Sequence, residues 1–413
     1  GVCSKHPCYN IKINKMKTTI ILLIILLLQI FISCQNSYHP TLLSGIENID
    51  INPNDIRMEN AFASKYIDSC QYIPLESSDS VMIGNIKQIF EDKDRFYIHD
   101  VTSDIIFIFE KTGKYLTKID RKGRGNDEYI KLTEMYLDPI NSDIIILCDR
   151  SQSLIRYNRN GNFINRTENK FITSAFASIN SDTIIAYAGR LPNESIFSST
   201  YPNGYLIVTM HNGKIINKFL ENKFDPIYLN YVSKTNYFFN FSDTLSLIED
   251  FSNTIYRIVS SSKIKPRYSV TFGKYTIPMN FNTPIEKVKE IISTYQKNPS
   301  TWCDIEKVIE KNNILLFHYY YEDLMHYAIY IKSQKQIQTI GPIWVNDIDG
   351  IGMPTICNSS LDNTLIGFIE SHIFIDLVKN SKKPSSHVVN ISHKLTEMDN
   401  PVLVKVFLKQ DIK

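Results

Sequence analysis

"DRFYIHD", residues Asp94–Asp100, returns as "DIIILCD" at Asp143–Asp149, 49 residues further on. The similarity continues in the segments that follow. "DIIFIFEKTGKYL" (Asp104–Leu116) aligns with "SLIRYNRNGNFI" (Ser153–Ile164). Self-similarity at a fixed period of this length is typical of repeat architectures. We therefore interpret the chain as a series of similar structural units.

Each of the two units contains four short runs of β-branched and aromatic residues, a composition typical of strands. The first run is "IKQIFED" or "LTEMYLD", and the second ends at Asp100 or Asp149. The third is "IIFIFE" or "LIRYN". A turn at Gly113 or Gly161 then leads to "KYLTKID" or "NFINRTE". The pattern predicts a four-stranded antiparallel sheet as the repeated unit.

Four weaker copies follow, at Asp182–Phe219, Asp243–Val259, Asn312–Gly341, and Asn363–Glu370 with Pro401–Lys409. Six such units predict an all-β fold, a six-bladed β-propeller of four-stranded antiparallel blades. One sheet cannot bury both of its faces alone, whereas neighbours in a closed ring bury them for each other. We assign the propeller to residues 71–413 and an anchor linker with an N-terminal segment to residues 34–70.

The sixth unit reaches only its third strand before the chain ends. We expect the N-terminal segment to supply the missing outer strand, either from Tyr72–Glu76 or from Asn48–Ile51. Two insertions interrupt the repeats. An apolar stripe at helical spacing predicts one helix over Pro284–Gln296, which either fills a gap at the edge of the ring or covers the pore. The polar segment Asn380–Asn400 is predicted to be a surface loop.

The N-terminus has the pattern of a secretory signal. Lys12, Lys15 and Lys17 precede the uncharged run Ile20–Ile32, and Ser33-Cys34 follow it. Residues 1–33 are therefore predicted to be an upstream extension and a signal peptide, with Met16 as the start of translation. The sequence "FISC" resembles the lipobox of bacterial lipoproteins, which implies lipid attachment at Cys34. We expect an outer-membrane lipoprotein of the cell envelope, facing either the periplasm or the surface.

Charge and cysteine content exclude two broad classes. The chain has 45 basic and 43 acidic residues, and a nucleic-acid-binding chain is usually strongly basic. We therefore expect no nucleic-acid partner. Cys70, Cys148, Cys303 and Cys357 are too few for a disulfide framework, although a Cys303–Cys357 bridge is left open. Cys148 lies in an apolar run and is expected to be a buried small hydrophobe.

Several segments together resemble a known family: "YIPLESSDSVMIGNIKQIF", "YIHD", "FIFEKTGKYL", "GRGNDEY" and "DNPVLVKVFLK". They are similar to secreted six-bladed β-propeller lipoproteins related to NHL-repeat proteins. In that family the link between blades often reads Gly-x-Gly-x-(Gly/Asp/Glu)-Glu-(Tyr/Phe), a pattern that Gly123, Gly125, Glu128 and Tyr129 fit. The resemblance implies a propeller in the cell envelope and no known reaction.

The link itself, "IDRKGRGNDEY" (Ile119–Tyr129), is interpreted as the corner between the first and second blades. Its two glycines are expected to adopt backbone angles that other residues resist, and its tyrosine is expected to pack between blades. A phosphate-binding loop is excluded because the GK[ST] sequence and the following helix are both missing. Linking loops gather at one mouth of a propeller channel. We therefore name Arg121, Arg124 and Glu128 as candidate binding residues.

No catalytic or metal-binding motif was found, and we expect no cofactor and no metal. His318, Glu322 and His326 have helical spacing, but the surrounding sequence predicts a hairpin that turns near Glu322-Asp323, with the histidines packed among tyrosines on adjacent strands. Asp100 and Asp149 recur at equivalent positions after the second strand. A residue needed in every repeat is expected to form turns rather than to catalyse a reaction.

These observations favour a binding or interaction module over an enzyme: a lipid-anchored propeller whose channel mouth receives a peptide, glycan or protein partner. The alternative is a metal-dependent propeller enzyme, similar to a lactonase or a lyase, with its site in the central channel. Three or four carboxylate, asparagine or histidine side chains converging on the axis would favour the enzyme. A plugged or apolar channel would exclude it.

Overall fold

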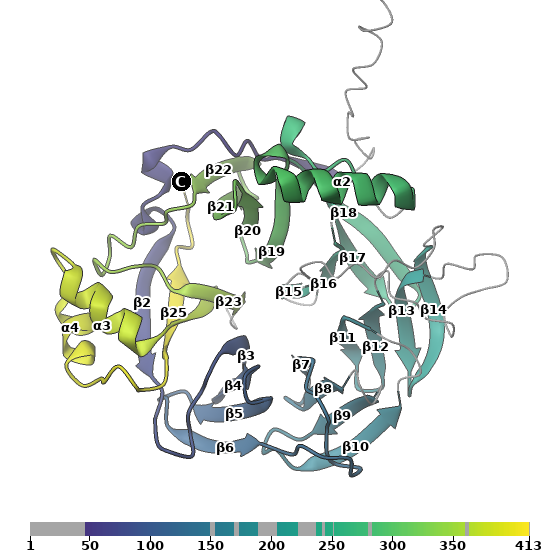
Figure 1. Cartoon of the computed structure of the whole chain (residues 1–413), viewed down its shortest axis with the longest axis horizontal. Coiled ribbons are helices and arrows are strands. Elements are labelled where there is room, and N and C mark those ends of the chain that lie inside the picture. Colours follow the sequence, from purple (N-terminus) through teal and green to yellow (C-terminus); the bar gives the residue numbers. More distant parts are fainter. Residues whose placement is uncertain are drawn as a thin grey trace, which may run out of the picture. The chain divides into compact units, whose positions relative to one another are not determined.

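Four antiparallel strands between Ile86 and Ile119 form one blade of a ring, and five further sheets complete that ring (Figure 1). The computed structural model describes residues 46–148, 153–168, 173–188, 205–221, 237–241, 244–250, 252–279, 283–359 and 363–412. All of them belong to a unit that spans residues 42–413. The predicted signal peptide, Cys34 and Asp149 lie outside the described residues.

Each blade runs from an innermost strand at the channel to an outermost strand at the rim. Blades one to three are β3 (Ile86–Glu91), β4 (Arg95–Asp100), β5 (Ile105–Glu110), β6 (Tyr115–Ile119); β7 (Glu134–Leu137), β8 (Ile144–Cys148), β9 (Ser153–Tyr157), β10 (Phe163–Glu168); and β11 (Ala175–Asn180), β12 (Thr183–Tyr187), β13 (Tyr205–His211), β14 (Lys214–Glu221). Blades four to six are β15 (Phe238–Phe241), β16 (Thr244–Ile248), β17 (Thr254–Ser260), β18 (Lys263–Thr271); β19 (Asp304–Glu310), β20 (Ile314–Tyr321), β21 (Leu324–Ile331), β22 (Gln336–Gly341); and β23 (Thr355–Ser359), β24 (Thr364–Ile369), β25 (Val402–Leu408), β2 (Ile67–Pro74). The predicted six-bladed β-propeller is confirmed.

The hydrophobic core lies between blades rather than within them. Tyr97 and Ile108 of blade one pack in one cluster with Met135 and Ile146 of blade two. The innermost strands β3, β7, β11, β15, β19 and β23 contact one another in a closed circle. Each strand alternates its side chains between two faces, and both faces are covered by neighbouring blades. This is why the inner strands read as almost continuous apolar runs.

The N-terminal segment closes the ring. β2 pairs antiparallel with β25 and becomes the outermost strand of blade six, with Tyr72 opposite Val404. The expected source of this strand near Tyr72 is thus confirmed. The other candidate, near Asn48, has a different role. β1 (Glu47–Asp50) adds a fifth strand to blade four, parallel to β18.

The predicted helix is present as α2 (Ile285–Lys297). Its buried face, formed by Val288, Ile291 and Ile292, packs with Ile277 and Met279 in a small cluster of its own. In Figure 1 the helix lies over blades four and five at the rim of the ring. No α2 residue lines the central cavity. The edge position, and not the cover over the pore, is therefore the arrangement observed.

The second insertion corrects a sequence prediction. The expected polar loop 380–400 contains helix α4 (Ser386–Ser392), and it follows helix α3 (Ser371–Asn380). Phe374, Val378 and Val388 anchor both helices in the apolar core of blades five and six. Within the segment 380–400 itself, Val388 is the one buried apolar residue, and a single anchor gives no periodic signal. Among the helices that the structure describes, none is long and apolar enough to cross a membrane.

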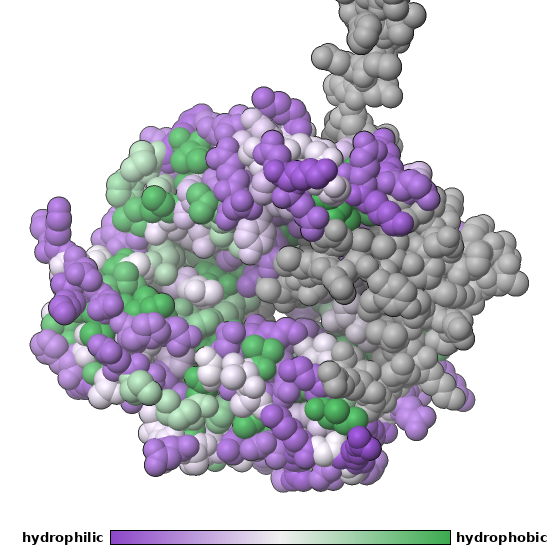
Figure 2. Space-filling model, viewed as in Figure 1, coloured by the Kyte–Doolittle hydropathy of each residue, from purple (hydrophilic) through white to green (hydrophobic). Residues whose placement is uncertain are grey.

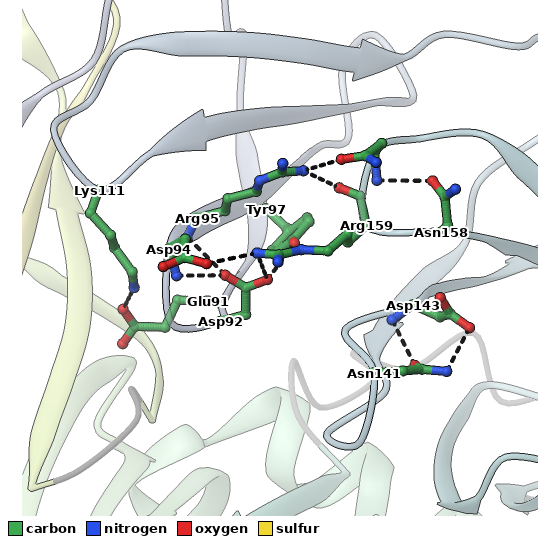
Figure 3. Close-up of polar contacts among 11 residues, drawn as sticks. Glu91, Asp92, Asp94, Arg95, Tyr97, Lys111, Asn141, Asp143, Asn158 and Arg159 are labelled. Atoms are coloured by element: carbon green, nitrogen blue, oxygen red, sulfur yellow. Dashed lines mark hydrogen bonds and ion pairs between the residues drawn. The ribbon is translucent and has the colours of Figure 1, made fainter.

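Polar side chains also join blades at their turns. The Asp92 carboxylate, in the turn after β3, accepts hydrogen bonds from the Tyr97 hydroxyl at 2.7 Å and from the Arg159 guanidinium at 2.9 Å (Figure 3). Arg159 comes from the turn between β9 and β10 of blade two. In return, the Arg95 guanidinium of blade one donates to the carbonyl oxygen of Arg159 at 2.6 Å. These reciprocal bonds fix the angle between blades one and two.

Candidate functional site in the central channel

The six innermost strands surround a cavity of about 990 Å³ at the centre of the propeller. Figure 2 shows the molecule hollowed at this point. Every innermost strand contributes lining residues, so that the walls come from all six blades. Binding sites for small molecules have volumes of roughly 300–1,000 Å³. The cavity is thus large enough to enclose a ligand and is the candidate site.

One wall of the cavity carries a row of aromatic rings from three consecutive blades. The centroids of Phe90 and Tyr136 lie 6.0 Å apart, as do those of Tyr136 and Phe176. The Tyr136 hydroxyl accepts a hydrogen bond of 2.8 Å from the Asn240 side-chain amide of blade four. Phe90 is half-buried, whereas Tyr136 and Phe176 belong to the apolar core behind the wall. The wall thus offers a ligand mainly the Phe90 ring, which the other two rings support, beside a fixed polar group.

Next to this row, a polar cluster joins blades one and two. The Gln88 side-chain amide donates to the carbonyl oxygen of Met135 at 3.2 Å and accepts from the Met135 N–H at 2.9 Å. It also donates to the Glu134 carboxylate. The Lys87 amine lies 3.2 Å from the same carboxylate. Burial raises the pKa of Glu134, and the neighbouring Lys87 amine opposes that rise. Each charge in this cluster has a partner.

Lys307 occupies the corresponding position in blade five. Gln88 and Lys307 each lie three residues before the last residue of their strand, β3 and β19 respectively. Gln88 pairs with His99 on the neighbouring strand, and Lys307 pairs with His318. A β-bulge precedes both positions and aims the side chain at the next blade. The Lys307 amine donates to the carbonyl oxygen of Ile356 on β23 at 3.1 Å, as Gln88 does to that of Met135 on β7.

Lys307 is buried, with 9% of the residue exposed, and it lines the cavity. Within the described part of the chain, no carboxylate forms an ion pair with its amine, and its one hydrogen-bond partner is the neutral carbonyl of Ile356. Burial lowers the pKa of the Lys307 amine, while Cys357 and the adjacent Glu306 act in the opposite direction. A buried amine with a neutral partner is an incompletely compensated charge.

The corner Ile119–Tyr129 packs as the sequence predicts. Tyr129 is fully buried between blades one and two, and its hydroxyl donates to the carbonyl oxygens of Asp104 at 2.6 Å and of Ile119 at 3.1 Å. The role expected for the glycines is wrong, because neither Gly123 nor Gly125 has a positive φ. A side chain is excluded at these positions because the Glu128 side chain lies against both glycines. A Cβ on Gly123 would be 1.9 Å from the Glu128 carboxylate.

The three binding residues predicted from this corner lie at the rim and do not line the cavity. Arg121 is paired with Asp127 at 2.5 Å, and the Glu128 carboxylate accepts from the Gly125 N–H at 2.8 Å. The backbone of the corner is held by Arg166 of the outermost strand β10, which donates to the carbonyl oxygen of Glu128 at 2.8 Å. Arg124 is exposed and forms no hydrogen bond or ion pair with other described residues.

The two histidines considered as metal ligands point away from each other. The hairpin turns at Glu322-Asp323 as predicted, with positive φ at both residues. His326 faces Tyr319 across the strands and His318 faces Tyr327, so that the histidines lie on opposite faces of the sheet. The predicted packing among tyrosines is confirmed. In the described ranges, no group of three or more His, Cys, Asp or Glu side chains could hold a metal ion.

Asp100 is a turn residue, as predicted. Its carboxylate accepts hydrogen bonds from the Ser103 hydroxyl at 2.6 Å and from three backbone N–H groups. Burial alone would raise the pKa of Asp100, but these bonds outweigh it and lower the pKa. The cysteines that the structure describes are all free, so the Cys303–Cys357 bridge left open above is absent, and Cys148 is buried as expected.

Comparison with known proteins places the chain in a family. A family model described as a domain of unknown function, DUF4934, matches residues 46–407. The chain belongs to the DUF4934 family. One solved structure matches with 16% sequence identity and a TM-score of 0.68, and the match covers 88% of this chain and 100% of the other chain. It comes from Bacteroides fragilis, and its name assigns it to the exported proteins. This similarity supports the fold.

Two further solved structures are less similar to this DUF4934 chain. A member of the DUF4221 family from Bacteroides vulgatus has 10% identity and a TM-score of 0.48, covering 83% of this chain and 97% of its own. A virginiamycin B lyase from Staphylococcus aureus, solved with quinupristin, has 13% identity and a TM-score of 0.37, covering 83% and 99%. No curated protein sequence matches the chain.

Sequence reasoning missed Gln88, Glu134, Tyr136 and Lys307 as lining residues of the DUF4934 channel. They are single polar or aromatic positions in apolar strands, and nothing marks them before the register of each strand is known. One signal was available. "KQIFE" (Lys87–Glu91) and "EKVIE" (Glu306–Glu310) align so that glutamine and lysine share a position, with a glutamate three residues later in both.

Proposed function

We propose that this chain is a binding module of the cell envelope and that its central channel is the binding site. One observation carries the proposal: all six blades contribute to a cavity of about 990 Å³ that has an aromatic wall and a few fixed polar groups. A concave, mostly apolar site with a few convergent polar groups is the usual form of a ligand site. The occupant is a peptide, a glycan or the end of a protein partner.

The rim can extend such a contact. Of the three residues predicted at the corner between blades one and two, Arg121 and Glu128 already have partners within the corner. Arg124 projects from the same corner with its guanidinium exposed. A partner that extends from the channel to the rim would reach this exposed guanidinium. We therefore propose Arg124 as an auxiliary contact, while Arg121 and Glu128 support the loop that carries it.

We further propose that the module is attached to the outer membrane through a lipid on Cys34. The proposal rests on the signal-like residues 1–33 and the lipobox-like "FISC". The B. fragilis propeller whose name assigns it to the exported proteins is consistent with it. Membrane fractionation of the wild type and of Cys34→Ser tests this part. We expect the wild type in the membrane fraction and the variant in the soluble fraction, whereas equal membrane association of both would contradict it.

A metal-dependent enzyme has less support from the described residues. The carboxylates among the described lining residues are Glu91 and Glu134, and both are ion-paired with lysines. The convergence of three or four ligands that would favour such an enzyme is not present in that part of the lining. Binding is therefore the function that the geometry supports best.

Thermal melts of the full-length protein with panels of oligosaccharides and short peptides test the channel as a binding site. A ligand at about 100 times its Kd adds roughly 2.7 kcal/mol of stability, which raises the Tm of a chain of this size by a few degrees. Asn240→Trp places a large ring in the cavity from an exposed position on β15. Ile216→Trp is the matched control, on the exposed face of the outermost strand β14.

We expect any ligand that raises the Tm of the wild type and of Ile216→Trp to have no effect on Asn240→Trp. A ligand that stabilises all three proteins equally binds outside the channel, and that result would contradict the proposal.

A further inference from the structure

Lys307 carries a positive charge that the propeller itself does not use. The side chain at this position of a blade joins two neighbouring innermost strands with a hydrogen bond to a carbonyl oxygen. In blade one the neutral amide of Gln88 makes that bond, to Met135. In blade five the Lys307 amine makes it, to Ile356. Because a neutral donor is sufficient in blade one, the charge in blade five is not required for joining the strands.

Among the described residues that line the cavity, every carboxylate is already paired with another lysine, so none is left to balance this charge. Lys87 is paired with Glu134. The Glu91 carboxylate binds the amines of Lys111 and Lys405, both of which lie outside this cavity. Lys311, the remaining lysine of the lining, has an interaction of its own. Lys307 is thus a lining cation that donates to a neutral carbonyl and has no carboxylate partner among the described residues.

A buried ammonium group without an ion-pair partner is unfavourable, and an anion that enters the cavity and pairs with it would reduce that penalty. From this geometry we propose that the channel binds a ligand with a single carboxylate group and that Lys307 is its counter-charge. This inference rests on the proposed binding function of the channel. One unpaired lysine balances one negative charge, as a carboxylate supplies. A phosphate monoester carries about −1.5 to −2 at neutral pH and would leave part of its charge uncompensated.

The remaining walls describe the rest of the ligand. The half-buried Phe90 presents its ring with Tyr136 and Phe176 packed behind it, and the exposed Asn240 amide adds a polar contact. A ligand of the inferred class therefore has an apolar or sugar-like body that lies against the rings, with its carboxylate directed to blade five. The body and the carboxylate are recognised by different blades, and their contributions can be separated by experiment.

The first variant is Lys307→Gln, which copies blade one. It removes the charge and keeps a donor for the Ile356 carbonyl oxygen. We expect the ligand-free Tm of this variant to equal or exceed that of the wild type, because an uncompensated buried charge is gone. Lys307→Met also removes the donor, and we expect a lower Tm than for Lys307→Gln. A marked loss of Tm in Lys307→Gln would show that the charge is structural, and that result would overturn the inference.

The second measurement compares acids with their neutral counterparts, using the full-length protein in detergent. The probes are 4-phenylbutyrate with 4-phenylbutyramide, and galacturonate with galactose, titrated by calorimetry. A hydrogen bond to a charged group contributes about 1.5–3 kcal/mol, which corresponds to at least a tenfold preference. We expect about this preference for the acid in one of the two pairs, and the pair that shows it identifies the body of the ligand.

In Lys307→Gln the preference should disappear, while Lys263→Gln, at the exposed first residue of β18, should keep it. A preference that persists in Lys307→Gln, or equal affinities for acid and neutral compound in the wild type, would overturn the role of Lys307. In either case, if Asn240→Trp abolishes binding of the probe, the channel remains the binding site and only the role of Lys307 is wrong. If none of the four probes binds the wild type, the carboxylate inference fails, while the thermal melts with oligosaccharides and peptides still decide whether the channel is a binding site.

Discussion

The Arg267 guanidinium forms two hydrogen bonds with the Glu310 carboxylate, at 2.6 and 2.7 Å, and so joins the fourth strand of blade four, β18, to the innermost strand of blade five. The Lys332 amine of blade five lies 2.8 Å from the same carboxylate. Glu310 is fully buried. Two cations from neighbouring blades thus share one buried anion, which fixes how the blades are spaced around the channel.

Blade one contains the same arrangement at the equivalent positions. Glu91 is the last residue of β3, as Glu310 is of β19. Its carboxylate binds Lys111 of its own blade (Figure 3) and Lys405 of blade six, the latter at 3.3 Å. Lys111 follows the third strand of blade one, as Lys332 follows the third strand of blade five. The repeat of the sequence therefore extends to the ion pairs between blades.

Replacing Glu310 tests the importance of these contacts. Glu310→Gln leaves Arg267 and Lys332 partly buried without their anion, and removing one partner of a buried ion pair costs about 3–5 kcal/mol. We expect a clearly lower Tm and a lower midpoint of urea unfolding. Asp55→Asn is the control, because the Asp55–Arg57 pair is exposed and should contribute little. Equal stabilities of the two variants would contradict the structural role of Glu310.

The closure of the ring can be tested at Gly113. Its φ is +88°, and a Cβ there would be 2.1 Å from the carbonyl oxygen of Pro74, at the end of the closing strand β2. Gly113→Ala should therefore disturb the contact between blades one and six. Gly273→Ala is the matched control, with φ +57° and no atom within 4 Å of the added Cβ.

A left-handed backbone costs an alanine about 1–2 kcal/mol, so Gly273→Ala should lose about that amount. Gly113→Ala should lose more, because the clash with Pro74 adds to the strain. Unfolding by urea measures both. If the two variants lose the same stability, the close approach of β2 to the Gly113 turn is not what holds the ring closed.

The corner between blades one and two depends on the Tyr129 hydroxyl. Tyr129→Phe leaves the carbonyl oxygens of Asp104 and Ile119 without this donor in a buried site. We expect a loss of about 1–3 kcal/mol in the free energy of unfolding. Tyr115→Phe is the control, because the Tyr115 hydroxyl forms no hydrogen bond with other described residues. If both variants lose the same small amount of stability, the packing of the aromatic side chain at position 129 is sufficient to hold the corner.

His99 predicts a loss of stability in acid. It is fully buried, and neither ring nitrogen has a hydrogen-bond partner among the described residues. Burial, with a further effect of the nearby Lys87, lowers the pKa of His99 to about 3, whereas an unfolded histidine titrates near 6.5. Between these values the unfolded state binds a proton that the folded state does not, so stability falls as pH decreases from about 6.5 to about 3.

His99→Leu should remove this part of the pH dependence, about 1 kcal/mol per pH unit in that window. Chemical unfolding at several pH values between 4 and 8 measures it. His393→Leu, at an exposed position after α4, should keep the slope of the wild type. Identical slopes in wild type and His99→Leu would show that the imidazole becomes protonated in the folded protein.

Much of the fold could be predicted because a propeller repeats its pattern. Turn residues such as Gly113 and Gly161 recur at a near-constant interval, and apolar strands between them leave few alternatives. What could not be predicted depends on single contacts between distant segments. One example is the choice between β1 and β2 as the closing strand, which depends on the strand that each one meets. Another is the packing of α3 and α4, which depends on the apolar core of blades five and six.

The candidate site was less accessible to sequence reasoning. The predicted residues Arg121, Arg124 and Glu128 share a charged, glycine-containing segment that is conspicuous in the sequence, and they lie at the rim. Lys307 is one lysine among 45 basic residues. Its position becomes meaningful only through the register that aligns it with Gln88 and through its burial beside the cavity.

The most direct test of the central claim is the fluorescence of 8-anilinonaphthalene-1-sulfonate, an aromatic monoanion, titrated into the folded protein. The channel account predicts one bound dye per chain in the wild type and in Ile216→Trp, weaker binding in Lys307→Gln, and none in Asn240→Trp. Binding of the same strength and stoichiometry in Asn240→Trp would contradict it, because the dye would then occupy a site outside the channel.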